Sequence, residues 1–282
     1  KLHEVVDKSP IYYTHPSFGY FFEQFHSQPE KGIFRLAKYE FGSESLDKPR
    51  LSTASVSDET KLPDAITNTF GQLAAQAGDL HEANFQDTLI ITGWLSRNLN
   101  ARGVELARGG RANEAEVFYL AANDLLKGSP NGNLTAQANL RHSLKIQNKP
   151  LDGYPFDEKL DELLSEDSLL SLSRIDQTLK TYGPLDEPKA CLLLGKFFES
   201  QSQIRQAYHE LVRATELTTT DPAPLLFVAN MFVAYGMPEK TQPFIEQLLK
   251  MIQNNPFELE QQVQLISIET GVKLLESDLE TA

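Results

Sequence analysis

The sequence predicts a mainly α protein, built as an α-solenoid of helical hairpins with a small aromatic-rich α/β cap at its N-terminus. Three observations lead to this class. Apolar residues recur at helical spacing through most of residues 56–282. Glycine and other turn residues separate these runs into pairs of short helices. Aromatic residues and short β-type runs are concentrated in residues 1–55 instead, which we treat as a separate cap domain.

The N-terminal cap contains ten of the 26 aromatic residues of the chain, all between Tyr12 and Phe41. Residues 11–13 and 32–39 are rich in β-branched and aromatic side chains and are predicted to form short strands. Residues 18–26 fit either one helix or an irregular aromatic plug. Because the end of a solenoid must be covered, we expect this cap to seal the first hairpin.

The region 56–282 is predicted to form a continuous helical series. The Pro- and Gly-containing residues 149–156 read as a loop, and Gly183-Pro184 is predicted to end a helix. The helix over 134–147 resembles the first half of a hairpin whose second half is missing. In chain order, helices are expected over residues 62–77, 80–91, 94–108, 112–126, 134–147, 157–164, 169–182, 188–200 and 204–217, then in a last hairpin opened by Asp221-Pro222, and in a capping helix over 257–279.

Small residues recur at a fixed interval in this helical region. Gly103 and Ala115 are twelve residues apart, and each is expected where the two helix axes of one hairpin approach closely. Tyr119 is large and is expected to fill the space between that hairpin and the next. The same interval separates Gly71 from Ala83, Gly195 from Ala207 and Ala229 from Thr241, and the expected turn positions are Gly78, Gly110, Ser202 and Gly236.

This pattern resembles the tetratricopeptide repeat (TPR), a 34-residue unit with a small residue in its first helix, a turn, and an Ala–aromatic–Ala series in its second. Gly195 and Ala229 are separated by 34 residues. The sequence departs from the repeat where Asp87 replaces the aromatic residue and Thr241 replaces the first alanine, and the usual Trp is absent. The resemblance implies a stack of hairpins whose first helices line an extended concave groove.

Three short runs carry a second resemblance. Residues 11–23 (IYYTHPSFGYFFE), 98–106 (NLNARGVEL) and 183–188 (GPLDEP) are similar to segments of large uncharacterised bacterial multi-span membrane proteins that are themselves similar to glycosyltransferases. In those proteins a TPR tail follows the membrane region. The resemblance implies that this chain is such a soluble tail on the extracytoplasmic face of the inner membrane; otherwise we expect it in the cytoplasm. Because the chain begins with Lys1, we expect a fragment or a processed product.

The charge of the chain limits its partners. With 39 acidic and 26 basic residues, the formal net charge is −13. Nucleic acids and anionic membrane surfaces both require a cationic protein surface, so neither is expected to be a partner. The most apolar run, from Leu225 to Tyr235, is interrupted by Asn230 and is shorter than the roughly 18 residues of a membrane span.

No catalytic constellation, metal site or cofactor motif is predicted. Cys191 is the single cysteine of the chain, so an intrachain disulfide is excluded. It occupies an apolar helix position, and we expect it to be a buried small hydrophobic residue rather than a nucleophile activated by His209. Glu23 and His26 have the spacing of half a di-iron site, with His15 nearby. A second half is missing, so packing of His26 in the aromatic cluster is the favoured interpretation and a metal enzyme the alternative.

The predicted groove would present a mixture of amides and cations. Such side chains can hold an extended peptide or its carboxylate, although here they do not fall in the register of the TPR carboxylate clamp. We therefore expect a non-catalytic scaffold that binds a protein or peptide partner, or an accessory tail of a membrane glycosyltransferase-like protein. The alternative interpretation is that these side chains bind no ligand and only contact solvent. The predicted ligand-binding residues are Asn68, Gln72, Arg97, Asn100, His142, Lys189, Lys196 and Asn230.

Overall fold

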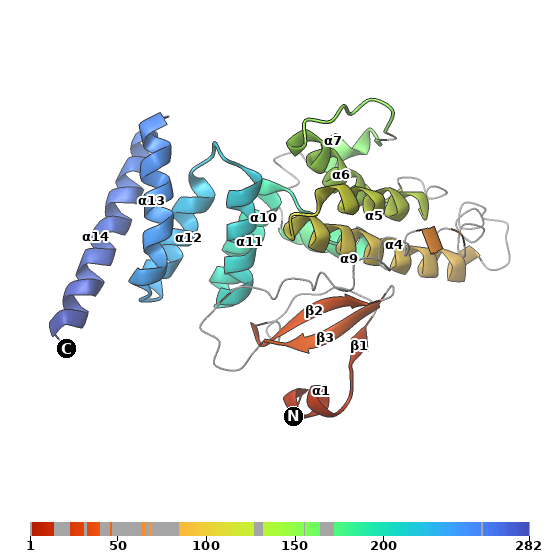
Figure 1. The fold of residues 1–282 in the computed structure, drawn as a ribbon, viewed down its shortest axis with the longest axis horizontal. Helices are drawn as coiled ribbons and strands as arrows, with labels where there is room; N and C mark the ends of the chain where they lie inside the picture. Colours follow the sequence, from red (N-terminus) through yellow and green to blue (C-terminus); the bar gives the residue numbers. More distant parts are fainter. Residues whose placement is uncertain are drawn as a thin grey trace. The chain divides into compact units, whose positions relative to one another are not determined.

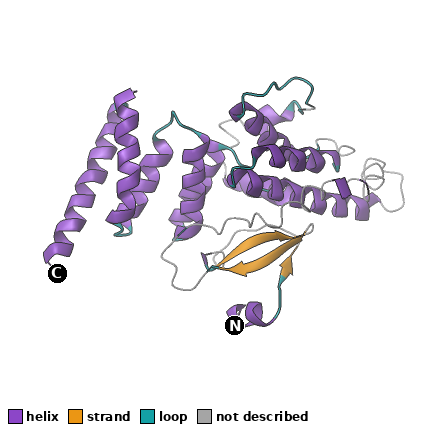
Figure 2. Cartoon of the chain, in the orientation of Figure 1, coloured by secondary structure: helices purple, strands orange, loops and turns teal. Residues whose placement is uncertain are grey.

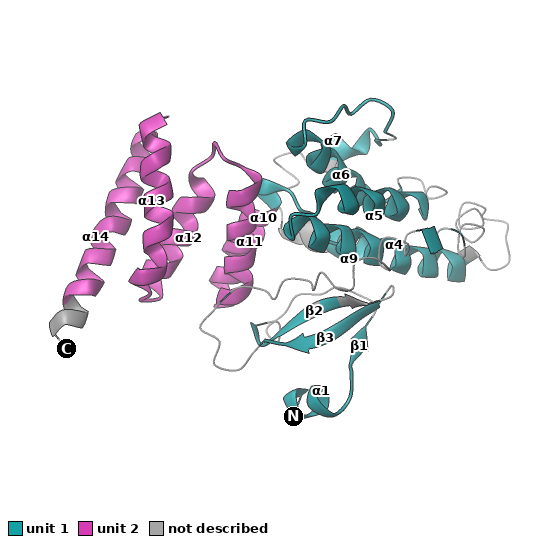
Figure 3. Cartoon of the chain, viewed as in Figure 1, with its two compact units in different colours: residues 1–190 teal, residues 191–282 magenta. Residues whose placement is uncertain are grey.

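The chain is mainly helical, with one small sheet near its N-terminus (Figures 1 and 2). The structure is a computed structural model; it describes residues 2–13, 23–30, 33–39, 46, 64–65, 68, 85–126, 132–154, 156–163, 172–254 and 256–281. The chain divides into two compact units, 1–190 and 191–282 (Figure 3). The predicted boundary between residues 55 and 56 and most of the predicted helix over 62–77 lie outside the described residues.

The N-terminal segment forms helix α1 (Leu2–Lys8) and an antiparallel sheet of strands β1 (Tyr12–Tyr13), β2 (Phe25–Glu30) and β3 (Ile33–Lys38), in the order β1-β3-β2. Strands are present in both segments predicted to contain them. Phe25 and His26, predicted to end a helix or plug, begin β2 instead. Pro29 is tolerated in β2 because an edge strand has one row of N–H groups that needs no partner.

Helix α4 (Phe85–Arg108) is a single helix of 24 residues. The sequence predicted two helices here, over 80–91 and 94–108, and that separation was wrong. The hydroxyl of Thr92 donates to the carbonyl oxygen of Thr88 at 2.8 Å, so this buried polar group is satisfied within the helix. A Cβ at Gly93 would meet no atom within 4 Å, and nothing in the packing breaks the helix at this glycine.

The turn after α4 is a Schellman motif that leads into α5 (Ala112–Asp124). Gly110 has a φ of +77°, which only glycine adopts without strain. The N–H of Arg111 donates to the oxygen of Leu106 at 2.9 Å, and the N–H of Gly110 donates to that of Ala107 at 3.0 Å. These bonds satisfy carbonyl groups that the helix end would leave without partners.

The second unit repeats this turn twice. Ser202 and Gly236 both have positive φ, at 57° and 68°, and both were predicted turn positions. The predicted turn at Gly78 lies outside the described residues. In each turn the following N–H reaches back five residues, from Gln203 to Phe198 at 2.8 Å and from Met237 to Phe232 at 2.9 Å.

Close packing in two of the hairpins depends on glycines that the sequence predicted at the approach of two helices. A Cβ at Gly103 would lie 2.5 Å from Cε1 of Tyr119, and a Cβ at Gly195 would lie 2.6 Å from Cγ of Leu211. Tyr119 therefore packs over Gly103 in its own hairpin, and does not only fill the space before the next one as predicted. Ala115, the expected partner of Gly103, is fully buried in the same core.

The described residues of the first unit also form α6 (Leu134–Ile146), α7 (Lys159–Leu163) and α9 (Leu172–Tyr182). The side chain of Asn133 accepts a hydrogen bond from the N–H of Ala136 and caps α6. Helix α6 packs against both α4 and α5, and Leu140 and Leu144 enter their core. The segment between α6 and α7 is irregular where described, as its Pro and Gly residues predicted.

The second unit is a series of packed helices that begins within α10 (Pro188–Ser200). It continues with α11 (Ile204–Leu217), α12 (Ala223–Ala234), α13 (Pro238–Asn254) and α14 (Leu259–Thr281). Its core includes Leu226, Leu248 and Ile268 from three of these helices. In the part of the chain that the structure describes, none of the helices has both the length and the apolar character that a bilayer crossing requires.

Candidate functional site

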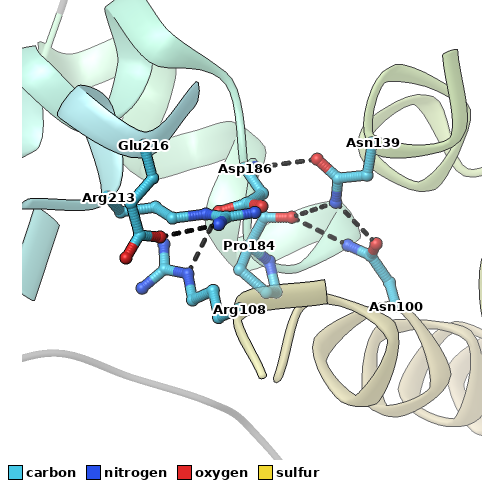
Figure 4. A network of polar contacts seen from close by, with 7 residues as sticks. All are labelled: Asn100, Arg108, Asn139, Pro184, Asp186, Arg213 and Glu216. Atoms are coloured by element: carbon cyan, nitrogen blue, oxygen red, sulfur yellow. Dashed lines mark hydrogen bonds and ion pairs between the residues drawn. The ribbon is translucent and has the colours of Figure 1, made fainter. Parts of the chain in front are cut away.

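A large network of polar contacts among the described residues holds the end of α9 and the non-helical residues after it against α4 and α6. We call residues 180–187 the bound segment; they run from the last turn of α9 to the start of α10. Figure 4 shows Pro184 and Asp186 of this segment with the side chains that contact them. The side chains that hold them lie 78 to 84 residues earlier in the chain on α4, and 45 to 49 residues earlier on α6 and at the residue that precedes it. The contacts are made mainly to backbone atoms of the bound segment.

Pro184 is held through its carbonyl oxygen. The Nδ2 groups of Asn100, from α4, and Asn139, from α6, each donate to this oxygen at 2.9 Å. Asn139 Oδ1 accepts a hydrogen bond from the N–H of Asp186 at 2.7 Å. The Asn139 side chain therefore bonds to the carbonyl group of Pro184 and to the N–H of Asp186, two residues later. Asn139 also donates to Oδ1 of Asn100 at 2.9 Å, which fixes the orientation of both amides.

The end of α9 is held in the same way. The carbonyl oxygen of Tyr182 accepts hydrogen bonds from Thr135 Oγ1 at 2.9 Å, Asn133 Nδ2 at 3.0 Å and Asn100 Nδ2 at 3.2 Å. The oxygen of Lys180 accepts from a terminal guanidinium nitrogen of Arg97 at 2.7 Å. Carbonyl groups in the last turn of a helix have no partner within it, so these side chains cap α9.

A charge pair completes the site. Arg108 Nε donates to Oδ1 of Asp186 at 3.0 Å, and the Asp186 side chain is only 4% exposed. Leu185, between the two anchored residues, is buried in a cluster with Leu160 and Ala190. The bound segment is therefore anchored by its backbone, by one carboxylate and by one apolar side chain.

The helix geometry explains why α4 can follow the segment. Arg97, Asn100 and Arg108 lie on one face of α4, and the first and last are about 16 Å apart along the axis at 1.5 Å per residue. They meet Lys180, Pro184 and Asp186 in the same order. Lys180 lies in the last turn of α9, and the chain leaves the helix at Gly183 before it reaches Pro184 and Asp186, so the contacts follow α4 from Arg97 to its end at Arg108.

Gly183 permits the close approach of the segment to α4. Its φ is +94°, and a Cβ there would lie 3.1 Å from Nδ2 of Asn100 and 3.2 Å from the oxygen of Arg97. Glycine therefore serves both the backbone conformation and the contact. The predicted helix end at Gly183-Pro184 is thus also the point at which the chain enters the site.

Two of the predicted ligand-binding residues, Arg97 and Asn100, belong to this arrangement. Asn100 is fully buried and bonded to the protein's own chain, so it is not open to a ligand in this structure. Arg97 is half-buried, and this burial lowers the pKa of its guanidinium group. His142 is half-buried in α6, four residues before its end.

Two others, Lys196 and Asn230, lie in the second unit. Lys196 and Asn230 occupy equivalent positions 34 residues apart, on α10 and α12, and both are exposed. The ammonium group of Lys196 lies 5.1 Å from the ring centre of Phe227, and Phe227 precedes Asn230 by nearly one helical turn. This cation–π contact places the lysine over α12. We call Lys196, Phe227 and Asn230 the α10–α12 face.

The remaining predicted ligand-binding residues are not brought together. Lys189 and Asn68 are exposed, and Gln72 lies outside the described residues. The predicted alternatives in catalysis are equally dispersed: Cys191 is buried, the ring of His26 packs 5.0 Å from that of Tyr39, and His15 is outside the described residues. Among the residues described, His, Cys, Asp and Glu side chains form no group of three or more that could hold a metal.

Sequence reasoning missed most of the site. It did not single out Asn133, Thr135, Asn139, Arg108 or Asp186. One signal was available in the helix over 134–146. Its polar residues are spread around the helix and do not form one polar face, so some of them must be buried and hydrogen-bonded within the protein. A second was the pair of runs 98–106 and 183–188, which the structure brings into contact through Asn100 and Pro184.

In comparisons with known proteins, no family model and no curated protein matches this chain.

Proposed function

We propose that this chain is a non-catalytic, TPR-like helical-repeat scaffold that binds an extended segment of a protein partner. The observation that carries the proposal is the way α4 and α6 hold residues 180–187. Helix α4 is the first of its hairpin, and α6 was predicted to be the first of another. Their asparagine side chains form hydrogen bonds with backbone groups of the non-helical residues Pro184 and Asp186. A surface of this kind suits an extended peptide, because backbone groups recur whatever the sequence.

The α10–α12 face is where we place the partner. In the first unit the corresponding surface is already filled by the bound segment. In the second unit Lys196 and Asn230 are exposed on the first helices of two successive hairpins, at the equivalent repeat position. A lysine above an aromatic ring with an amide one turn away can pair with a carboxylate and bond to a peptide group. An extended peptide with an acidic side chain fits this chemistry.

A displayed library of random peptides, sorted against the full chain, tests the proposal. Peptides that bind would then be measured against the wild type, Lys196→Glu and Lys250→Glu. Lys250 is exposed on α13, so its substitution makes the same charge change away from the α10–α12 face. We expect Lys196→Glu to weaken binding by about tenfold or more and Lys250→Glu to leave it within about twofold. Equal affinities for all three proteins would refute this placement.

A further inference from the structure

Three polar side chains of the second unit are spaced by 34 residues. Lys196 of α10, Asn230 of α12 and Gln264 of α14 follow one another at this interval, and all three are exposed. The amide groups of Asn230 and Gln264 form no hydrogen bond with another residue that the structure describes, and Lys196 has no carboxylate partner among those residues. The spacing that produced the α10–α12 face therefore continues onto α14.

The packing of α14 shows which of its sides faces α12. A Cβ at Gly271 would lie 2.6 Å from Cγ1 of Val233, so this side of α14 packs closely on α12. Gln264 and Glu260 precede Gly271 by about two and about three helical turns, which places all three on the same side of the helix. The exposed residues Gln264 and Glu260 therefore lie on the side of α14 that faces α12.

The contact between Val233 and Gly271 also sets the levels of the two helices. Short connections precede and follow α13, so α12 and α14 are each antiparallel to it and run in the same direction (Figure 1). Seven residues before this contact, Gln264 of α14 is level with about the position of Phe227 on α12. Lys196 lies over the Phe227 ring from α10, so Lys196 and Gln264 lie on either side of α12.

Two opposite charges end this row of side chains. Lys196 is at one end on α10, and Glu260, one turn before Gln264, is at the other end on α14. Glu260 is exposed and forms no ion pair or hydrogen bond within the described part of the chain. Packed helices are about 8–10 Å apart, so the row spans roughly 16–20 Å across α12. An extended peptide, at about 3.3 Å per residue, covers that distance in about six residues.

We propose that the partner of the α10–α12 face is an extended peptide with an acidic residue that pairs with Lys196 and, about six positions away, a basic residue that pairs with Glu260. This inference rests on the function proposed above and specifies the charge pattern of the partner. Asn230 and Gln264, between the two charges, bond to peptide groups, which recur whatever the sequence. Because the two ends of the row carry opposite charges, they also set the direction in which the peptide lies.

Selection of peptides against charge variants tests this pattern. A displayed library of random peptides is sorted separately against the full wild-type chain, Lys196→Glu, Glu260→Lys and Glu276→Lys. Glu276 is exposed near the other end of α14, so its substitution makes the same charge change away from the row. The wild type and Glu276→Lys should enrich peptides with an acidic and a basic residue about six positions apart. Glu260→Lys should enrich peptides with acidic residues at both positions, and Lys196→Glu peptides with basic residues at both.

Affinities of one selected peptide then separate direct pairing from an effect on the helix. Glu260→Lys should weaken binding of that peptide about fivefold or more, and replacing the basic residue of the peptide by Glu should restore binding to this variant. Glu260 also lies in the first turn of α14, where the helix dipole favours a carboxylate. A merely loosened helix would weaken binding of both peptides, and that outcome would overturn the inference.

The outcomes distinguish this inference from the proposed function. If Lys196→Glu changes the selected peptides and Glu260→Lys does not, the charge pattern is wrong and the placement of the partner on the α10–α12 face stands. If neither substitution changes the selection, or if no peptide is enriched against the wild type, both proposals fail.

Discussion

Asn100 donates a hydrogen bond of 2.9 Å to the carbonyl oxygen of Pro184, which lies 84 residues further along the chain. Asn139 donates to the same oxygen at the same distance from a different helix. A carbonyl oxygen has two lone pairs, so Pro184 uses both and joins α4 to α6. Substitutions in this network should therefore weaken the folded first unit itself.

Asn100→Asp should destabilise the protein although it changes almost no volume. The aspartate would place an acceptor where a donor now faces the oxygens of Pro184 and Tyr182. We expect a loss of about 1–3 kcal/mol or more in the free energy of unfolding, measured by urea denaturation. Gln86→Glu makes the same amide-to-carboxylate change at an exposed position of α4 and should have little effect. Equal midpoints for the two variants would contradict the assigned hydrogen bonds.

Gly183→Ala should destabilise the protein more than Gly153→Ala. Both glycines have positive φ, at +94° and +90°, so an alanine is strained at each by about 1–2 kcal/mol. Only at Gly183 would the new Cβ also press on Asn100, 3.1 Å away, whereas Gly153 has nothing within 4 Å. The difference between the two urea midpoints isolates the contact with α4. No difference would show that Gly183 serves the backbone conformation alone.

Gly103→Ala and Gly93→Ala should have opposite effects, although both glycines lie in α4. At Gly103 the Cβ would overlap the ring of Tyr119, and we expect a loss of about 1–3 kcal/mol. At Gly93 there is free space, and alanine should stabilise the helix by about 0.5–1 kcal/mol. Thermal unfolding of both variants checks the sign of each change. Similar shifts would mean that Tyr119 can move away at no cost.

Glu187→Gln should stabilise the protein at about pH 7 and have less effect at about pH 4. Burial raises the pKa of Glu187 above its ordinary value of 4.5, although its carboxylate accepts a hydrogen bond from the N–H of Ala190 at 2.9 Å. A raised pKa means that folding favours the protonated form. The stability that this group contributes is present below pH 4.5 and is lost as the pH rises through the raised value.

Glu114→Gln supplies a control with the opposite sign. The hydrogen bond from Arg111 lowers the pKa of Glu114. Its contribution to stability is present above the ordinary pKa and is lost as the pH falls through the lowered value, so Glu114→Gln should destabilise at about pH 7 and have little effect at low pH. Urea midpoints of both variants across this range provide the measurement. The same sign for both variants at neutral pH would contradict the environments assigned to them.

Local signals predicted the hairpins well. Gly110, Ser202 and Gly236 were identified as turns because each follows the small residue of a first helix by seven positions, and each adopts a positive φ. The helices over 188–200 and 204–217 have the expected bounds, because their ends carry their own turn chemistry. The predicted break between residues 91 and 94 was wrong: α4 runs through Gly93, where nothing in the packing ends the helix.

The site was much less predictable. Asn100 was expected to face a groove, since its position in the repeat lies on the first helix of a hairpin. The runs 98–106 and 183–188 were noted separately, but their contact was not predicted, because a hydrogen bond between Asn100 and Pro184 depends on the path of the intervening chain. The exposure of Val263, Ile266 and Leu274 on α14 was not predicted for a related reason: an amphipathic pattern shows that a helix has an apolar face, but not which of two faces is covered.

The sequence by itself determined the helical class, the turns and the small residues that let paired helices approach, because each of these depends on side chains within a few positions of one another. The tertiary structure alone decided which polar residues are buried together and which apolar residues remain exposed. Both outcomes depend on contacts between segments far apart in the chain, such as Asn139 with Asp186, and no local pattern encodes the distance between such segments.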